Sequence, residues 1–471
     1  MKRIRRQICA LCAFLCALSL LTMLVFSLSV SANGARWLNR AQNTRIQEAR
    51  KTTVQGTLYD SALTPLAYSA RAGEREYISD RAARLSLSHV IGDQKGMSET
   101  GAEIRFATTL LGMTDKTGTD KTLQSLMGDD PVGYDIVLTV NAELNKYVAS
   151  LFPEGARGAC VIINYKTGEI LCKVSLPAFD PARMDAPVED TAYYDRATQF
   201  RYAPGSVFKI VTLSAALEAI PGVLEEKFNC DGEWDFAGSV IRCAGGTAHG
   251  EITLKEAFAK SCNITFASLA YKMGTARLRA EAEKFGFNTE FQFDDVIMYA
   301  SRCLNTSDSE GDLIQAGFGQ GTTDVTPLHM AMISGAIANG GVMMEPRLVK
   351  EVRRHSGLVI SKTQAKEYIT CVDPELANTV AYYMYETVKS GTGSRANISG
   401  YTDGFICGKT GSAETSSDKN SQTNAWYTGF LYRDEAHPYA IAVVVEQGGA
   451  GGSVAAPIAA KALKKAIDLG L

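Results

Sequence analysis

The sequence predicts an α+β protein in which helices pack on a sheet, held at a membrane by one N-terminal helix. Three observations lead to this prediction. The chain has 471 residues with 46% apolar content, enough for the hydrophobic cores of two or three domains. Residues 8–32 contain no charged side chain. From about residue 157 onward, apolar strands and apolar helices alternate irregularly, which is typical of α+β domains.

Composition narrows the function classes. The net charge is −3 with both signs interspersed, so we expect no nucleic-acid partner. The five histidines are scattered, and no HExxH or paired CxxC spacing offers a metal site. We therefore expect a mechanism without a metal or a cofactor.

The N-terminus predicts a membrane anchor. Residues 1–7 carry four positive charges, and residues 8–32 are close to the ~20 residues that span a bilayer. This charge asymmetry predicts a cytoplasmic tail, a single crossing and an extracytoplasmic remainder. The alternative is a cleaved signal peptide, because "VSA" at residues 30–32 resembles a cleavage site. The apolar run is longer than a typical signal core, which favours the anchor.

The elements that follow are read from their local pattern. Residues 36–51 are polar and helix-compatible, as in a stalk, and residues 56–69 read as strand, turn at Thr64-Pro65, and strand. Mixed polar sequence continues to about residue 131. Next come a strand in "YDIVLTVN", a helix in "AELNKYVASLF" and a hairpin in "GACVIINYKTGEILCKVSL".

The cysteines do not form a disulfide framework. Three of the eleven lie in the apolar run, and the other eight are widely spaced. Cys230 and Cys243 bracket a predicted hairpin with its turn near Ala237-Gly238. These two residues either pair or remain two buried thiols.

Lys-Thr-Gly, or Lys-Ser-Gly, occurs four times, and context separates the four. Residues 116–118 lie in a polar loop, residues 166–168 form a hairpin turn, and residues 389–391 end a helix that starts at Asp373. Only residues 409–411 follow one plausible strand, "GFICG", and precede another, "AWYTGFLY". This copy is predicted to lie on a sheet edge and to face a bound substrate.

A Ser-x-x-Lys pair opens an apolar helix after the turn at Pro204-Gly205. Ser206 and Lys209 share a face of its first turn, and burial would lower the pKa of the lysine and make it a base. The helix N-terminus would aim N–H groups at a developing oxyanion. The alternative is a capping serine with a lysine that reaches solvent. A second such pair, Ser416 and Lys419, lies in a polar loop.

A Ser-x-Asn pair begins another apolar helix. Ser261 and Asn263 would present a hydroxyl and a carboxamide together. The alternative is a helix cap, with Cys262 as a small core residue. The other Ser-x-Asn, at residues 31–33, lies at the membrane exit.

Ser-x-x-Lys, Ser-x-Asn and Lys-Thr-Gly in this order are shared by penicillin-binding proteins and serine β-lactamases. The chain from about residue 137 resembles the transpeptidase domain of a class B penicillin-binding protein, a monofunctional peptidoglycan D,D-transpeptidase. The resemblance rests on "DRATQFRYAPGSVFK", "HGEITLKEAFAKSCNITFA", "GFGQGTTDVTPLHMAMISGAIANGG" and "GTGSRANISGYTDGFICGKTGSAET". It implies a penicillin-binding/β-lactamase-like fold with an antiparallel sheet flanked by helices.

The resemblance also implies the domain organisation. We expect a cytoplasmic tail at 1–7, an anchor at 8–32, a stalk and small mixed α/β pedestal of the dimerisation type at 33–135, and the transpeptidase domain at 136–471. "GTLYD" and "GMSETGAEIRFATTLLG" resemble the family's pedestal segments, although Gln55 stands where an arginine is usual and no Asn-Gly turn follows Asp60. The short pedestal, with no module after Leu471, resembles the compact elongation or sporulation members.

The resemblance assigns a role to each matching residue. Lys209 would deprotonate Ser206, which attacks a D-Ala-D-Ala stem peptide, and Ser261 would relay the proton to the departing D-Ala. An amine of a second stem would then take the acyl group, and β-lactams would acylate the same serine. The residues that would bind the substrate are Asn263, Lys409, Thr410, Gly411 and Ser412, with the backbone N–H groups of Ser206 and Ser412 as the oxyanion hole.

Several rival functions share these motifs. A β-lactamase needs a base to hydrolyse its acyl-enzyme, and the one Glu-x-x-Asn between the second and third motifs starts at Glu375, in the first turn of a predicted helix. A D,D-carboxypeptidase is chemically closer, and a β-lactam sensor or a scaffold belongs to a different class. The complete motif set and the pedestal favour cross-linking. A membrane-embedded SEDS-type glycosyltransferase (shape, elongation, division and sporulation) is the expected partner.

Overall fold

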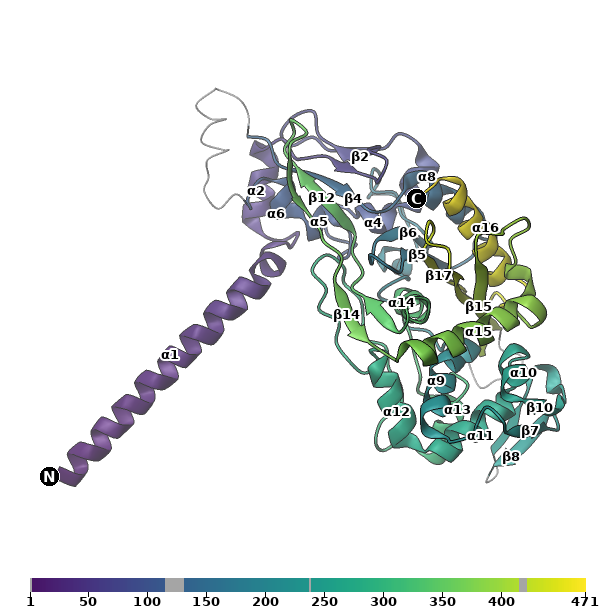
Figure 1. Cartoon of the computed structure of the whole chain (residues 1–471). Helices are drawn as coiled ribbons and strands as arrows, with labels where there is room; N and C mark the ends of the chain where they lie inside the picture. The colour runs from purple at the N-terminus through teal and green to yellow at the C-terminus, as the bar shows by residue number, and fades with distance from the viewer. Residues whose placement is uncertain (1, 115–130, 237–238, 415–421) are drawn as a thin grey trace.

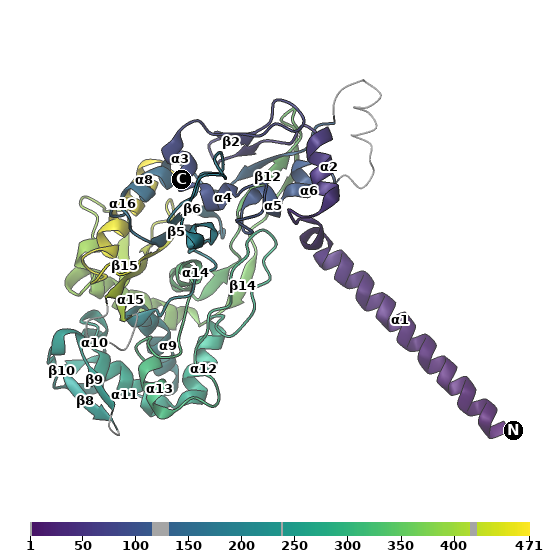
Figure 2. The same cartoon turned by 180° about the vertical axis from the view of Figure 1, so that it is seen from behind.

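The computed structural model describes residues 2–114, 131–236, 239–414 and 422–471. Helix α1 (Lys2–Leu38) extends away from the rest of the molecule in both views (Figure 1, Figure 2). Its segment Arg3–Ser29 is long and apolar enough to cross a membrane, and none of it is buried against the protein. A short polar helix, α2 (Thr44–Thr52), follows it.

The sheet with the longer strands is five-stranded and entirely antiparallel. Its order is β15-β16-β17-β5-β6, so that the last three strands of the chain pair with the hairpin predicted for residues 158–176. The strands are β5 (Gly158–Asn164), β6 (Ile170–Leu176), β15 (Phe405–Glu414), β16 (Thr423–Tyr432) and β17 (Tyr439–Val445). β15 is therefore an edge strand, as the position of the last Lys-Thr-Gly predicts.

Helices cover both faces of this sheet, because alternate side chains of each buried strand point in opposite directions. Cys160 and Ile162 of β5 face α8 (Ala142–Ser150) and α16 (Ala455–Asp468). Ala159 and Val161 face the opposite core, which contains α14 (Pro327–Ala338) and α15 (Pro374–Ser390). The predicted α+β class, with an antiparallel sheet flanked by helices, is confirmed.

A helical region stands beside the sheet and carries two of the three motifs. It contains α9 (Lys209–Ala219), α10 (Leu254–Ala259), α11 (Asn263–Met273), α12 (Thr275–Lys284) and α13 (Glu310–Ala316). Two small antiparallel pairs lie next to α10 and α11 (Figure 1). They are β7 (Lys227–Cys230) with β10 (Gly250–Thr253), and β8 (Glu233–Phe236) with β9 (Ser239–Arg242).

A second, mixed sheet joins the N-terminal region to the remainder, in the order β13-β12-β4-β1-β2-β3. Its strands are β1 (Leu58–Tyr59), β2 (Pro65–Tyr68), β3 (Glu76–Tyr77), β4 (Asp135–Leu138), β12 (Val349–Arg353) and β13 (Val359–Lys362). The short helices α3 (Arg81–Ser86), α4 (Ser88–Ile91), α5 (Ala102–Arg105) and α6 (Ala107–Leu110) lie in the same region. Since β12 and β13 come from far along the chain, this sheet draws on both sides of the boundary expected at residue 135.

One predicted turn is misplaced. Pro65 is the first residue of β2, and the reversal lies between Asp60 and Thr64, with the Asp60 carboxylate accepting from the N–H groups of Ala62 and Thr64. Proline is well suited to the first position of a strand, where no ladder donor is lost. The tripeptide at 116–118 and the turn at 237–238 lie outside the described residues.

Candidate active site

The first motif sits on a tight turn rather than directly on an α-helix. Gly205–Phe208 form a 3₁₀ turn, and α9 begins only at Lys209. Gly205 has φ +56°, a conformation that favours glycine. Its N–H donates to Gly319 O at 2.8 Å, and a Cβ on Gly319 would lie 2.1 Å from Gly205 O. This close backbone contact fixes the turn that presents the half-buried Ser206.

Lys209 is fully buried, which excludes the alternative of a lysine that reaches solvent. Its Nζ lies 2.8 Å from Ser261 O, 3.2 Å from Ser261 Oγ and 2.8 Å from Asn263 Oδ1. Burial lowers the pKa of Lys209 to about 7, against a smaller opposing effect of the nearby Cys262 and Cys243 thiols. A large fraction of the amine is therefore neutral near pH 7 and available as a base.

The second motif lies between α10 and α11. Ser261 has φ +61°, which is rare for a residue with a side chain. The cap of α11 is Cys262, whose Sγ accepts from Thr265 N at 3.4 Å, so Ser261 is free of a capping role. Asn263 begins the helix, and its Nδ2 donates to Arg242 O at 2.9 Å, which turns Oδ1 toward Lys209.

The third motif lies on β15. Lys409 is fully buried, and its Nζ donates to Ser261 Oγ at 2.9 Å and to Thr410 O at 3.1 Å. Burial, and then the charge of Lys209, lower the pKa of Lys409. Gly411 lets the strand approach the 3₁₀ turn Gly205–Phe208, because a Cβ there would lie 2.8 Å from Pro204 O. We call this turn the nucleophile turn, since it carries the predicted nucleophile Ser206.

The remaining predicted residues flank this point. The Thr410 hydroxyl is 2.6 Å from the hydroxyl of Thr392, and the exposed Ser412 accepts at Oγ from Gly451 N at 3.1 Å. Residues 166–168 form the β5–β6 turn and residues 389–391 close α15, as predicted. The rival pair Ser416 and Lys419 lies outside the described residues.

The three motifs therefore meet at one atom. Ser261 Oγ lies within hydrogen-bond distance of both Lys209 and Lys409, although 148 residues separate Ser261 from Lys409. Ser206 stands one turn before Lys209, at the edge of this buried group. The arrangement offers a hydroxyl nucleophile, an amine base, a hydroxyl between two amines and a cation for an anionic substrate group, as acyl transfer through a serine requires.

Sequence reasoning assigned no role to three supporting residues: Gly319, Thr392 and Arg242. The first two lie in "GFGQG" and "GTGS", where clustered glycines were the available signal. Arg242 acts through its carbonyl oxygen, for which a sequence carries no signal.

Known proteins share this architecture. The family model described as "Penicillin binding protein transpeptidase domain" matches residues 158–464. A peptidoglycan D,D-transpeptidase, PbpA, of Mycolicibacterium smegmatis is 29% identical, over 80% of this chain and 81% of its own. PbpA of Mycobacterium tuberculosis is 30% identical over 72% and 74%. Stage V sporulation protein D of Bacillus subtilis is 31% identical over 72% and 54%.

Solved structures of penicillin-binding proteins have the same fold. The ceftriaxone acyl-enzyme complex of penicillin-binding protein A from M. tuberculosis aligns with a TM-score of 0.79 at 27% identity, covering 89% of this chain and 99% of that one. The D,D-transpeptidase domain from Eggerthella lenta aligns with a TM-score of 0.75 at 29% identity, with the same coverage. The motif geometry, the family model and these relatives together show that the chain belongs to the penicillin-binding protein transpeptidase family, as a class B D,D-transpeptidase.

Proposed function

We propose that this protein cross-links peptidoglycan by acylating Ser206 with a stem peptide that ends in D-Ala-D-Ala and passing the acyl group to an amine of a neighbouring stem. The observation that carries the proposal is the convergence of Lys209 and Lys409 on Ser261 Oγ beside the half-buried Ser206. The relatives' names supply the reaction class.

The hydrogen bonds of Lys209 support its role as the base. A neutral amine has two N–H donors and one lone pair. The carbonyl of Ser261 and the carboxamide oxygen of Asn263 are acceptors, each 2.8 Å from Nζ, and together they use both donors. The lone pair is then left for a hydroxyl, and Lys209 takes the proton of Ser206 as its Oγ attacks the penultimate D-Ala carbonyl.

Ser261 carries the proton onward. Its Oγ accepts from Lys409 at 2.9 Å and lies 3.2 Å from Lys209 Nζ. When the tetrahedral intermediate collapses, the C–N bond to the terminal D-Ala breaks. The proton held on Lys209 passes through the Ser261 hydroxyl to the departing amine.

Substrate binding uses β15 and the nucleophile turn. Lys409 and Thr410 bind the terminal carboxylate, and Asn263 holds the peptide amide. The backbone N–H groups of Ser206 and Ser412 stabilise the oxyanion. Burial lowers the pKa of Lys409 in the free protein, and an arriving carboxylate raises it again, so that the ion pair forms as the substrate binds.

The fate of the acyl-enzyme separates this proposal from a β-lactamase. Glu375, the candidate deacylation base, is exposed in the first turn of α15. Helix α15 has 17 residues and is about 25 Å long. Glu375 lies at its start, whereas Thr392, which follows its other end, forms a hydrogen bond with Thr410. We infer that Glu375 does not activate water there, and that the acyl group waits for an amine.

The test combines labelling with transfer. Penicillin treatment followed by peptide mapping should place one adduct on Ser206 and none in Ser206→Ala. A stem-peptide donor with an amine acceptor should give a cross-linked dimer. An adduct on Ser416, or a penicilloyl group that leaves within seconds in the wild type and persists in Glu375→Gln, would overturn the assignment.

The membrane setting is part of the same proposal. We infer that residues 1–7 stay in the cytoplasm, residues 8–32 cross the membrane once, and residues 33–471 lie outside with the substrate. A SEDS-type glycosyltransferase, contacted by the anchor and the pedestal (residues 33–135), supplies the glycan strands. External protease on spheroplasts should degrade the catalytic domain, and its protection would contradict this topology.

A further inference from the structure

Two threonine hydroxyls join the end of α15 to the third motif. The Thr392 hydroxyl lies 2.6 Å from the Thr410 hydroxyl, and either oxygen could be the donor. Thr410 is buried on β15, whereas Thr392 is exposed just past Ser390, the last residue of α15. Among the described residues, the Thr410 hydroxyl bonds to Thr392 alone. The direction in which Thr410 points its proton therefore depends on Thr392.

The backbone holds Thr392 in this position from two sides. Its N–H donates to Ala259 O at 3.2 Å, and Ala259 is the last residue of α10, shortly before Ser261. A Cβ on Gly391 would lie 2.4 Å from the same oxygen, and a Cβ on Gly452 would lie 2.5 Å from Thr392 O. A side chain at either glycine would push this segment away. Thr392 therefore stands at a close-packed junction between the second and third motifs.

Lys409 alone does not satisfy a substrate carboxylate. A charged lysine has three N–H donors, whereas a carboxylate has two oxygens with about four acceptor positions. Two of the Lys409 donors are used by Ser261 Oγ at 2.9 Å and by Thr410 O at 3.1 Å. One donor remains, so the carboxylate needs a further donor. The Thr410 hydroxyl is the next group along the strand.

A hydroxyl can be that donor only if its single proton points at the substrate. The Thr410 proton can point either to Thr392 Oγ1 or away from it. When the Thr392 hydroxyl donates to Thr410 Oγ1, the Thr410 proton has to point away from Thr392 and is left for the carboxylate. The two hydrogen bonds then run in one direction, and in such a chain each bond polarises and strengthens the next.

We propose that Thr392 is a positioning residue for substrate binding: its hydroxyl donates to Thr410 and directs the Thr410 proton to the terminal carboxylate of the donor stem. A penicillin presents a carboxylate at the equivalent place, beside its β-lactam nitrogen. The pair therefore favours ligands with a free carboxylate over ligands in which this group is esterified or amidated. Thr392 acts through Thr410 and needs no contact with the substrate. The inference rests on the function proposed above, which places the carboxylate at Thr410.

Two ligands that differ only in the carboxylate test this role. Thr392→Val keeps the branched shape of the side chain and removes the hydroxyl. Its acylation by benzylpenicillin should fall by roughly 3–10-fold, the contribution of one hydrogen bond. Acylation by benzylpenicillin methyl ester, which has no carboxylate, should stay at the wild-type rate. Intact-mass time courses of the full-length chain in detergent would measure both rates.

Two further variants control for the substitution itself. Thr392→Ser restores a hydroxyl and should restore the wild-type ratio of the two rates. Thr379→Val removes the hydroxyl of another threonine of α15, which donates to Glu375 O at 3.1 Å, and should change neither rate. If the threonine pair only tied α15 to β15, Thr392→Val would slow acylation by both ligands equally. Equal slowing therefore overturns the proposal.

A double-mutant cycle tests whether Thr392 acts through Thr410, and it needs only benzylpenicillin. Thr410→Val removes the group that Thr392 is proposed to orient. Adding Thr392→Val to this variant should cause no further loss. If the second substitution lowers acylation by the same factor in both backgrounds, Thr392 acts independently of Thr410 and the proposal is wrong.

Cross-linking gives the same distinction with the peptide substrate. Transfer from a donor stem with a free terminal carboxylate should fall by roughly 3–10-fold in Thr392→Val, whereas transfer from a donor with a terminal carboxamide should not. A wild-type chain that benzylpenicillin never acylates at Ser206 overturns the proposed function, and this inference with it. Normal acylation of the wild type, with an unchanged ratio of acid to ester in Thr392→Val, overturns only the role of Thr392.

Discussion

At the scale of single residues, Lys209, the proposed base, should control the pH range in which the enzyme reacts. Burial lowers the pKa of Lys209 to about 7. The base must be unprotonated, so the acylation rate should fall about tenfold per pH unit below that value and level off above it. Stopped-flow measurements with a fluorescent penicillin between about pH 5 and pH 9 would trace this curve.

The control for this prediction is Lys209→Arg, which keeps a positive charge that cannot be lost. Its acylation should be slower than the wild-type rate above pH 7 by about 10²–10⁴-fold, and its pH profile should lack the inflection near pH 7. If Lys209→Arg keeps the wild-type rate and profile, another group is the base.

Gln55 shows how a local departure from the family pattern is compensated. The buried Glu103 carboxylate accepts from Gln55 at 2.8 Å and from Arg75 at 2.6 Å, and Arg75 also donates to Gly56 O at 2.9 Å. Arg75 thus supplies the guanidinium beside the position where the family usually has an arginine. Arg75→Met would leave the buried carboxylate without its cation, and we expect a loss of about 3–5 kcal/mol in unfolding free energy.

Urea unfolding of Arg75→Met checks this loss against a matched control. Lys51→Met breaks the pair between Lys51 and Glu48, whose side chains are 67% and 69% exposed, and should cost less than about 1 kcal/mol. Equal effects of the two substitutions would show that the buried pair is not important for stability.

At the scale of elements, the sequence predicted correctly the helices and turns that are specified by neighbouring residues, such as caps and turn glycines. The helix from Pro374 to Ser390 has the expected Asp373 cap and ends before Gly391, and the turn at residues 166–168 joins two strands as expected. The helix after Pro204 instead begins as a 3₁₀ turn, because Gly205 packs against Gly319, more than 100 residues away. Contacts of this range leave no mark on local periodicity.

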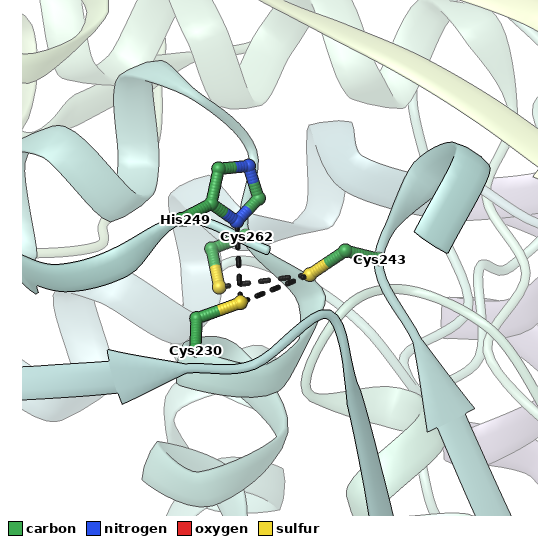
Figure 3. Close-up of side chains that lie close together, drawn as sticks. All are labelled: Cys230, Cys243, His249 and Cys262. Atoms are coloured by element: carbon green, nitrogen blue, oxygen red, sulfur yellow. Dashed lines mark hydrogen bonds between the residues drawn. The ribbon is translucent and has the colours of Figure 1, made fainter. Parts of the chain in front are cut away.

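The candidate active site was likewise predictable only where local sequence motifs mark it. The motif residues were predicted from spacing and resemblance, and the structure brings Ser261 to both lysines. The role of the Arg242 carbonyl was not predicted, because a sequence carries no signal for a backbone group. The sequence also left open whether Cys230 and Cys243 pair; both are free thiols, with their sulfurs 3.6 Å apart and with His249 and Cys262 beside them (Figure 3).

The contact between β15 and the nucleophile turn gives an element-scale prediction. In Gly411→Ala the new Cβ would lie 2.8 Å from Pro204 O and 3.2 Å from Val207 Cγ1, so strand and turn must separate. We expect penicillin acylation to fall at least tenfold, or about 1.4 kcal/mol in the barrier, with only a modest change in melting temperature. Intact-mass time courses would measure it.

Gly311→Ala is the matched control within α13. Its Cβ would meet only Ser309 Oγ, at 3.5 Å, and alanine favours a helix by about 0.5–1 kcal/mol. This variant should keep the wild-type acylation rate. Normal acylation by Gly411→Ala would contradict the role of the close approach.

At the scale of the whole molecule, two buried histidines set the acid limit of stability. His89 donates to Ala192 O and His329 to Phe285 O, both as neutral rings. Burial lowers the pKa of each from 6.5 to about 4. Stability is therefore complete above about pH 6.5 and is lost as the pH falls toward 4, by roughly 3 kcal/mol per histidine.

Unfolding measured at several pH values would test this loss. His329→Gln should be less stable at pH 7 and lose less on acidification, because one of the two titrating groups is gone. An unchanged slope between about pH 6.5 and 4 would show that the acid transition has another origin.

The anchor gives the last prediction, which concerns assembly. Within the described residues, the apolar helix Arg3–Ser29 buries none of its surface against the protein, so all of it is available to lipid or to another membrane helix. A transpeptidase also needs glycan strands, and the proposed glycosyltransferase lies in the same membrane. Two signals, the anchor and the pedestal, would keep the two enzymes together. The full-length chain should co-purify with a SEDS-type protein, and deletion of residues 8–130 should abolish recovery.

Replacing residues 8–32 with an unrelated membrane helix distinguishes the contribution of the anchor from that of the pedestal. We expect this variant to recover less of the partner, because helix contacts in membranes depend on the facing side chains. Equal recovery with the isolated catalytic domain would refute the assembly, since neither signal would then be needed.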